Sequence, residues 1–91
     1  MPDDPLTQRV FSVIAATQRI PFDKITIDGK FAELGIDSMD GVNILFGLEN
    51  EFDITIPDEA AKQIRDVRQM VEGVSRLVSE KEAADPASAV N

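Results

Sequence analysis

The spacing of the apolar residues constrains the fold of this chain most strongly. Near the C-terminal end, apolar side chains recur every three or four positions, at Val67, Met70, Val71, Val74, Leu77 and Val78. A helix has about 3.6 residues per turn, so this spacing places all of them on one face. Asp66 stands directly before the pattern, where its carboxylate can cap the first turn. We therefore expect a helix that begins after Asp66 and packs its apolar face against a core.

Three further helices are expected, the two longer ones from the same apolar period and the short one from the stretch around Pro57. The first runs from about residue 4 to 19, with Pro21 placed to end it. Its apolar face is expected to hold Leu6, Val10, Val13, Ile14 and Thr17. The second is expected over residues 38–52, and a short third over about 58–63, with Pro57 near its first turn. These elements predict an all-α fold, a small four-helix bundle of three main helices and one short helix.

A long loop over residues 21–37 is expected between the first and second helices. Its apolar residues, which should anchor it in the core, are Ile25, Ile27, Phe31 and Leu34. Gly29 and Gly35 permit its turns. A loop of this length inside a small domain is uncommon and usually has a function. We expect one domain over residues 1–82 and a disordered, small and polar tail over residues 83–91.

The composition excludes several kinds of chemistry. The chain has 91 residues with neither cysteine nor histidine, so disulfides, thiolate metal sites and the usual general base are absent. Ser38 therefore has no histidine to activate it as a hydrolase nucleophile, and we expect neither an enzyme nor a metal site. The first residues lack the pattern of a signal peptide, and no apolar run is long enough for a membrane span. We expect a cytoplasmic protein.

The negative charge is concentrated in one stretch. The net charge is −8, and the interval between Lys30 and Lys62 contains eight acidic residues and no basic one. The rest of the chain is neutral, with nine acidic and nine basic residues. A field of one sign repels nucleic acid and attracts basic partners. Charge alone leaves a second interpretation open, a solvated face that only aids solubility.

The second predicted helix has two apolar faces. The first is suited to the core and consists of Ile44, Leu45, Leu48 and Phe52. The second lies beside Ser38 and consists of Met39, Val42 and Phe46, with Glu49 in the same sector and Asp40 further round. A surface helix needs only one buried face, so a second one bordered by acidic residues indicates a docking surface for a partner. The alternative is that the long loop covers it.

Two segments of the sequence resemble the acyl carrier protein family. Residues 33–40, "ELGIDSMD", place Ser38 between two aspartates at an expected helix start, which by itself is explained by helix capping. However, Asp37, Ser38 and the apolar residue after them match the family's attachment motif, usually Asp-Ser-Leu. Residues 51–59, "EFDITIPDE", are a second and independent match. With the helices on either side, the resemblance covers nearly the whole ordered chain.

The resemblance implies a carrier domain in which Ser38, next to Asp37, carries covalent 4′-phosphopantetheine. A phosphopantetheinyl transferase would add this group from coenzyme A, making a phosphoprotein whose terminal thiol holds acyl groups as thioesters. At a helix N-terminus the phosphodiester would meet free N–H groups. The residues implied in partner binding are Met39, Asp40, Val42, Asn43, Phe46 and Glu49. The partners implied are acyl-loading ligases or synthases and acyltransferases with basic patches, as in fatty acid biosynthesis.

Departures from the family pattern suggest a specialised carrier. Met39 stands where leucine is usual, and Asn43 and Asn50 replace frequent acids. Gly47 lies in the middle of the predicted helix, at a cost of about 1 kcal/mol relative to alanine, and close packing of a neighbouring helix would explain it. An amino acid or polyketide cargo and an unmodified acidic helical adaptor stay open as alternatives. We expect a monomer that binds no nucleic acid and inserts into no membrane.

Overall fold

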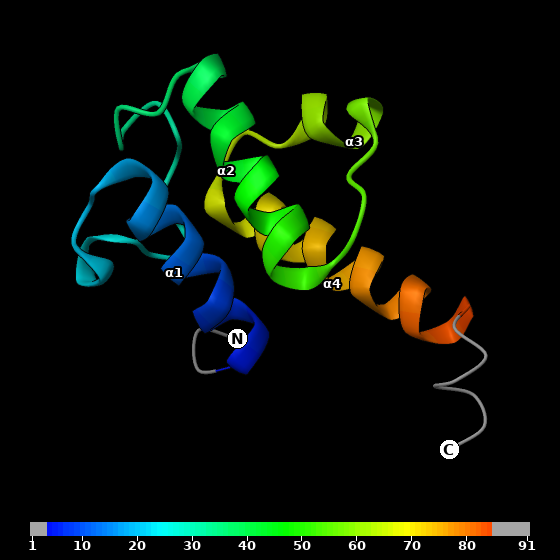
Figure 1. Ribbon diagram of the computed structural model, residues 1–91. Coiled ribbons are helices and arrows are strands. Elements are labelled where there is room, and N and C mark those ends of the chain that lie inside the picture. Colours follow the sequence, from blue (N-terminus) through cyan, green and yellow to red (C-terminus); the bar gives the residue numbers. More distant parts are fainter. Residues whose placement is uncertain (1–3, 85–91) are drawn as a thin grey trace.

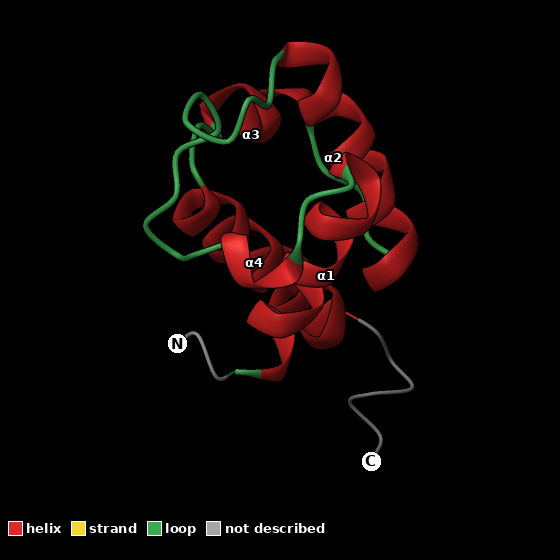
Figure 2. Ribbon diagram, turned by 90° about the vertical axis from the view of Figure 1, so that its left-hand side faces the viewer, coloured by secondary structure: helices red, strands yellow, loops and turns green. Residues whose placement is uncertain are grey.

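The computed structural model describes residues 4–84, which form four α-helices and one short 3₁₀ turn (Figure 1). The elements are α1 (Pro5–Gln18), η1 (Phe22–Lys24), α2 (Ser38–Phe52), α3 (Asp58–Gln63) and α4 (Val67–Ala84). No strand is present in this part of the chain, as the colouring of Figure 2 shows. The predicted all-α bundle of three main helices and one short helix is therefore confirmed, and the bounds of α2 are those expected.

The core lies where α1, α2 and α4 meet. Its fully buried side chains include Val10 and Ile14 of α1, and Ile44 and Leu48 of α2. The α4 face is as predicted: Val67, Met70, Val71 and Val74 are buried, and Leu77 and Val78 are half-buried. Helix α1 packs along α2 and also contacts α4. The apolar spacing in the sequence thus corresponds to one shared core.

The buried face of α1 is rotated from the expected one. Thr7 and Phe11 are buried, whereas Thr17 is exposed and its hydroxyl donates to the carbonyl of Val13 at 2.9 Å. The expectation that Thr17 faces the core was therefore wrong. The ring of Phe11 lies 6.0 Å from the ring of Phe22 in η1, centroid to centroid. The Phe22 ring at the start of the long loop thus packs against α1, and this contact favours burial of Phe11.

Gly47 allows α1 and α2 to approach closely. A Cβ atom at this position would lie 2.8 Å from Cγ1 of Val13 and 3.4 Å from Cγ2 of Thr17. Separations below 3.0 Å require one of the groups to move. Glycine is unfavourable inside a helix by about 1 kcal/mol relative to alanine. The close packing of α1 explains why it is nevertheless found here, as the sequence suggested.

The loop over residues 21–37 is fixed to the start of α4. Its predicted anchors lie against the core: Ile25 is buried, and Ile27, Phe31 and Leu34 are half-buried. Ile36 is also buried, which the sequence did not predict. The N–H of Phe31 donates to the carbonyl of Arg65 at 3.2 Å, and the N–H of Val67 donates to the carbonyl of Gly29 at 2.9 Å. These bonds hold the loop beside the segment that joins α3 to α4.

Helix α4 begins where the sequence predicts, but it ends later than expected. A carboxylate oxygen of Asp66 accepts from the N–H of Gln69 at 2.8 Å, which confirms the predicted cap. The helix continues through Ala84, two residues into the expected tail, and residues 85–91 lie outside the described part of the chain. Within residues 4–84, no helix has the length and apolar character needed to cross a membrane.

Candidate functional site

Ser38 is the first residue of α2 and is exposed. The helix is capped by Asp37 instead: its carboxylate accepts from the N–H of Asp40 at 2.9 Å, and the carboxylate of Asp40 accepts from the N–H of Asp37 at 3.4 Å. Because both aspartates form this capping box, the hydroxyl of Ser38 is not needed to cap the helix. Helix capping therefore explains Asp37 and Asp40 but leaves the serine unexplained.

The first turn of α2 has further unused polar groups. Within residues 4–84, no acceptor pairs with the N–H of Ser38 or Met39, and the hydroxyl of Ser38 has no hydrogen-bond partner. Free N–H groups and the helix dipole favour a negative group at such an end. The geometry suits a serine that receives a group and holds it.

The second apolar face of α2 is open. The exposed fractions of its side chains are 78% for Met39, 46% for Val42 and 59% for Phe46. The long loop therefore does not cover this face, and the prediction of two apolar faces on α2 is confirmed. We call these three residues the apolar stripe. It begins at the residue after Ser38.

The polar residues expected beside the apolar stripe have different surroundings. Asn43 is exposed. Asp40 is half-buried in the capping box, and its carbonyl accepts from the side-chain amide of Gln18 at 3.4 Å. The carboxylate of Glu49 accepts from the N–H of Ile56 at 2.8 Å. This bond holds the segment after α2 against the helix, a structural role for Glu49 that sequence reasoning missed.

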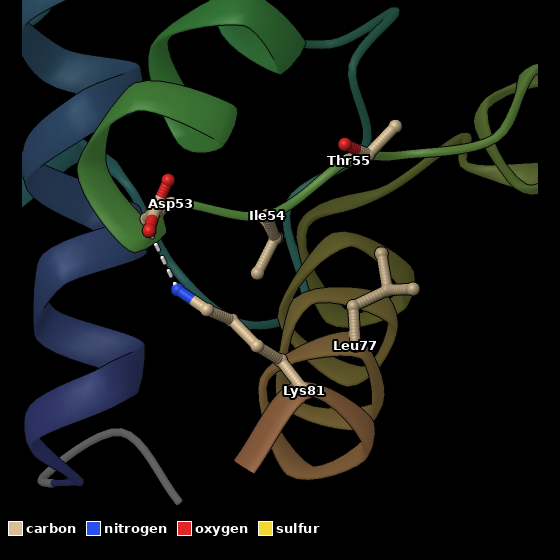
Figure 3. A pocket seen from close by; sticks show the side chains of 5 residues that line it. All are labelled: Asp53, Ile54, Thr55, Leu77 and Lys81. Atoms are coloured by element: carbon tan, nitrogen blue, oxygen red, sulfur yellow. Dashed lines mark hydrogen bonds and ion pairs between the residues drawn. The ribbon is translucent and has the colours of Figure 1, made fainter. Parts of the chain in front are cut away.

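Acidic residues at the far end of α2 are paired with cations. Glu51 binds Arg9 of α1 at 2.9 Å, and Asp53 binds Lys81 of α4 at 2.8 Å. Figure 3 shows Lys81 reaching past Ile54 to Asp53, across a shallow pocket of about 340 Å³. This pocket lies about 20 Å from Ser38 along α2, given a rise of about 1.5 Å per residue. The acidic stretch is therefore not a single surface of unpaired carboxylates, because some of them form ion pairs that link α2 to α1 and α4.

A larger cavity of about 610 Å³ opens beside Ser38, between α2, α3 and the long loop. Its apolar lining includes Phe31, Ile36, Leu45, Ile64 and Met70. Its charged lining consists of Asp37, Asp58, Lys62 and Arg65. Sequence reasoning missed Lys62 and Arg65 because they follow the acidic stretch, more than twenty residues after Ser38. Only the return of α3 toward the start of α2 brings them to the cavity that Ser38 also lines.

The described residues offer no metal centre. Within residues 4–84, no group of three or more carboxylate side chains is arranged to hold a metal ion. The site therefore consists of a free hydroxyl at a helix start, an adjoining cavity with a largely apolar lining and an open apolar stripe. These features suit a group that is attached at the serine, rests at the cavity and is presented to partners.

Comparisons with known proteins agree with this geometry. A family model described as "Phosphopantetheine attachment site" matches residues 8–74, well over half of the chain. An acyl carrier protein of Akkermansia muciniphila is 36% identical over 78 residues, covering 85% of this chain and 98% of the relative. One from Rickettsia bellii is 41% identical over 69 residues, covering 75% and 80%. "Acyl carrier protein 5, chloroplastic" of Arabidopsis thaliana is 52% identical over 60 residues.

The extent of these matches differs among the relatives. The match to the Arabidopsis protein covers 66% of this chain and 43% of that protein, whereas the bacterial relatives are matched over most of their length. The relatives include chloroplastic and bacterial proteins, so the expected cytoplasmic location stays a prediction. The matched residues include α2, the cavity and the first part of α4, up to residue 74. The chain belongs to the acyl carrier protein family and is a carrier with covalently attached 4′-phosphopantetheine.

Proposed function

We propose that Ser38 is the residue to which 4′-phosphopantetheine is attached. The observation that carries this proposal is an exposed serine at the first position of α2 whose hydroxyl has no hydrogen-bond partner within residues 4–84. The neighbouring aspartates cap the helix, so modification of Ser38 leaves the cap intact. The unpaired N–H groups of Ser38 and Met39 are directed toward the helix start and favour an anionic substituent there.

The residues present fit this group. Its phosphodiester is negative and suits the helix start, and the cavity beside Ser38 has room for part of a flexible arm. When bound, the arm supplies the terminal thiol that this cysteine-free chain lacks and holds cargo there as a thioester. The protein holds the arm and exposes it. The reactions on the cargo are those of partner enzymes, since carriers of this family are not catalysts.

The apolar stripe is the proposed docking surface for those enzymes. Met39, Val42 and Phe46 are exposed, and desolvating them against a partner would stabilise the complex. Asp40 and Asn43 lie beside them, and Glu49 lies at the far end with its carboxylate already bonded to Ile56. Exposed charges near the stripe would raise association rates with basic partners. The partners are a phosphopantetheinyl transferase, an acyl-loading ligase or synthase, and acyltransferases.

Intact mass measurement tests the attachment site. After incubation with coenzyme A and a broad-range phosphopantetheinyl transferase, the wild type should gain the mass of one phosphopantetheine group. Ser38→Ala should gain nothing, and Ser75→Ala, which removes an exposed hydroxyl on α4, should gain as the wild type does. A Ser38→Ala protein that is still modified would assign attachment to another residue. The unmodified adaptor hypothesis predicts no gain in any of the three.

We further propose that the carrier is specialised, with acyl, polyketide or amino acid cargo as the candidates. Asn43 is exposed beside the apolar stripe, at a position that is often acidic in the family. With an enzyme that serves general acyl carriers, Asn43→Glu should raise the transfer rate about two- to fivefold at low salt. The gain should shrink at high salt, because salt screens exposed charges. Asn43→Gln is the neutral control, and equal rates for all three proteins would contradict a role for this charge.

A further inference from the structure

The cavity beside Ser38 has two cationic side chains at its rim, Lys62 at the end of α3 and Arg65 just after it. Both residues are exposed, and neither forms an ion pair within residues 4–84. Three other cations of the described chain, Arg9, Arg68 and Lys81, are paired with carboxylates. The cavity thus holds positive charge that the protein itself does not pair.

The carboxylates of the same cavity do not satisfy these cations. The carboxylate of Asp37 accepts the N–H of Asp40 and belongs to the cap of α2. Asp58 lies four residues before Lys62 on α3, a spacing that permits an ion pair, but the two side chains are not within pairing distance. Lys62 and Arg65 are therefore available to an anion that enters the cavity.

The apolar wall of the cavity favours such an interaction. Ile36 and Met70 line it and are buried, with exposed fractions of 7% and 0%. Charges that meet beside apolar groups are screened less than charges surrounded by water. The guanidinium of Arg65 can donate two parallel hydrogen bonds to a phosphate or carboxylate, and the ammonium of Lys62 adds a point charge. The combination favours a ligand with a negative group and an apolar part.

We propose that Lys62 and Arg65 bind an anionic group that an arm on Ser38 brings to this cavity. The inference rests on the proposed attachment at Ser38, which lines the same cavity. Two sources share the required chemistry: the phosphodiester of the arm, and a carboxylate carried by the cargo. In the second case the two cations select acyl groups that combine an apolar chain with a terminal carboxylate over neutral acyl groups of equal length.

The test compares four forms of the protein: unmodified, modified, and modified protein loaded with hexanoyl or adipoyl thioester. The two cargoes have six carbons each and differ by a terminal carboxylate. The readouts are the NMR side-chain resonances of Lys62 and Arg65 and the midpoint of thermal unfolding. The variants are Lys62→Gln and Arg65→Gln. Their controls are Lys24→Gln and Arg76→Gln, which remove exposed cations that line no part of this cavity.

The inference predicts a resonance shift at Lys62 and Arg65 when an anionic group arrives. A shift on modification assigns the phosphodiester, and a shift only on replacing hexanoyl by adipoyl assigns the cargo carboxylate. Whichever of these two steps shifts the resonances should also raise the unfolding midpoint by about 2 °C in the wild type and in both controls. It should not raise the midpoint in Lys62→Gln or Arg65→Gln. High salt should abolish the gain.

Two results would overturn the inference. One is that the resonances of Lys62 and Arg65 stay unchanged across all four forms. The other is that the control variants lose the gain in midpoint equally, which would reveal a general effect of net charge. Mass measurement on each sample separates these results from a failure of the proposed function: absence of modification at Ser38 contradicts that function, whereas a modified protein without shifts contradicts only the role of the two cations.

Discussion

The two ends of α2 differ in how their polar and aromatic groups are used. At the C-terminal end, the guanidinium carbon of Arg9 lies 4.3 Å from the centre of the Phe52 ring, and the same side chain binds Glu51. Lys81 binds Asp53 directly after the helix. At the N-terminal end, the hydroxyl of Ser38 has no partner in the described chain. Charged side chains bind the C-terminal end to α1 and α4, whereas the N-terminal end has one bond from Gln18 of α1 to Asp40 and leaves Ser38 open to the solvent.

This difference shows that residues of one type have different roles along a single acidic stretch. Glu51 and Asp53 pair with cations of other helices, Glu49 holds the backbone at Ile56, and Asp37 and Asp40 cap α2. The acidic side chains left free for a partner are therefore fewer than the sequence suggests. Those at the start of α3, Asp58 and Glu59, are exposed and have no ion pair within residues 4–84.

The largest expected effect tests the core side of α2 against its open side. Leu48 is fully buried, so Leu48→Ala should lower the free energy of unfolding by about 2–5 kcal/mol. Phe46→Ala should lower it by less than about 0.5 kcal/mol, because the Phe46 ring is more than half exposed. Urea unfolding measures both values. Equal losses in the two variants would contradict the division of α2 into a core face and a docking face.

A pair of glycines in α2 provides the next test. Gly47→Ala should destabilise the protein by about 1–2 kcal/mol, because its methyl group would overlap Cγ1 of Val13. The cost of this overlap should exceed the stability that alanine gains from its higher helix propensity. Gly41 has no atom within 4 Å of an added Cβ, so Gly41→Ala should stabilise by up to about 1 kcal/mol. Thermal unfolding of the two variants should therefore shift in opposite directions. A gain in stability for Gly47→Ala would show that α1 can move away without cost.

Much of the fold could be predicted from the sequence, because it depends on local rules. The apolar period predicted the three main helices, Pro57 indicated the short α3, and the capping residue Asp66 indicated the start of α4. The open apolar stripe was also predictable, since α2 carries more apolar faces than a small bundle can bury. Ser38 was singled out by its motif, and the structure adds that Asp37 is the cap.

The remaining features depend on contacts between distant parts of the chain. On the rotated face of α1, Phe11 contacts the ring of Phe22 in η1, and no helical period contains this contact. The role of Glu49 requires the backbone of Ile56 to return to α2. Likewise, Lys62 and Arg65 come to the cavity of Ser38 only through the placement of α3. Sequence patterns describe one element at a time, so these partners became visible only in three dimensions.

The smallest expected effect concerns pH and the fastened end of α2. The hydrogen bond and the positive charge of Lys81 lower the pKa of the Asp53 carboxyl below its usual value. The unfolded chain then binds a proton at Asp53 more readily than the folded protein does. The stability contributed by this pair is therefore fully present above the pKa that Asp53 has in the unfolded chain. It is lost as pH falls through the lower pKa that Asp53 has in the folded protein. Because the Asp53 side chain is 95% exposed, the contribution should be small.

Lys81→Gln should raise the pKa of Asp53 toward its ordinary value, as measured by NMR titration of its carboxyl carbon. The variant should also lose less stability than the wild type on acidification below pH 4, since the linked proton uptake is smaller. Arg76→Gln removes a cation from the same helix without touching Asp53 and should leave that pKa nearly unchanged. An unchanged pKa in Lys81→Gln would show that the pair does not persist in solution. The C-terminal end of α2 would then be held by Arg9 and the buried core rather than by Lys81.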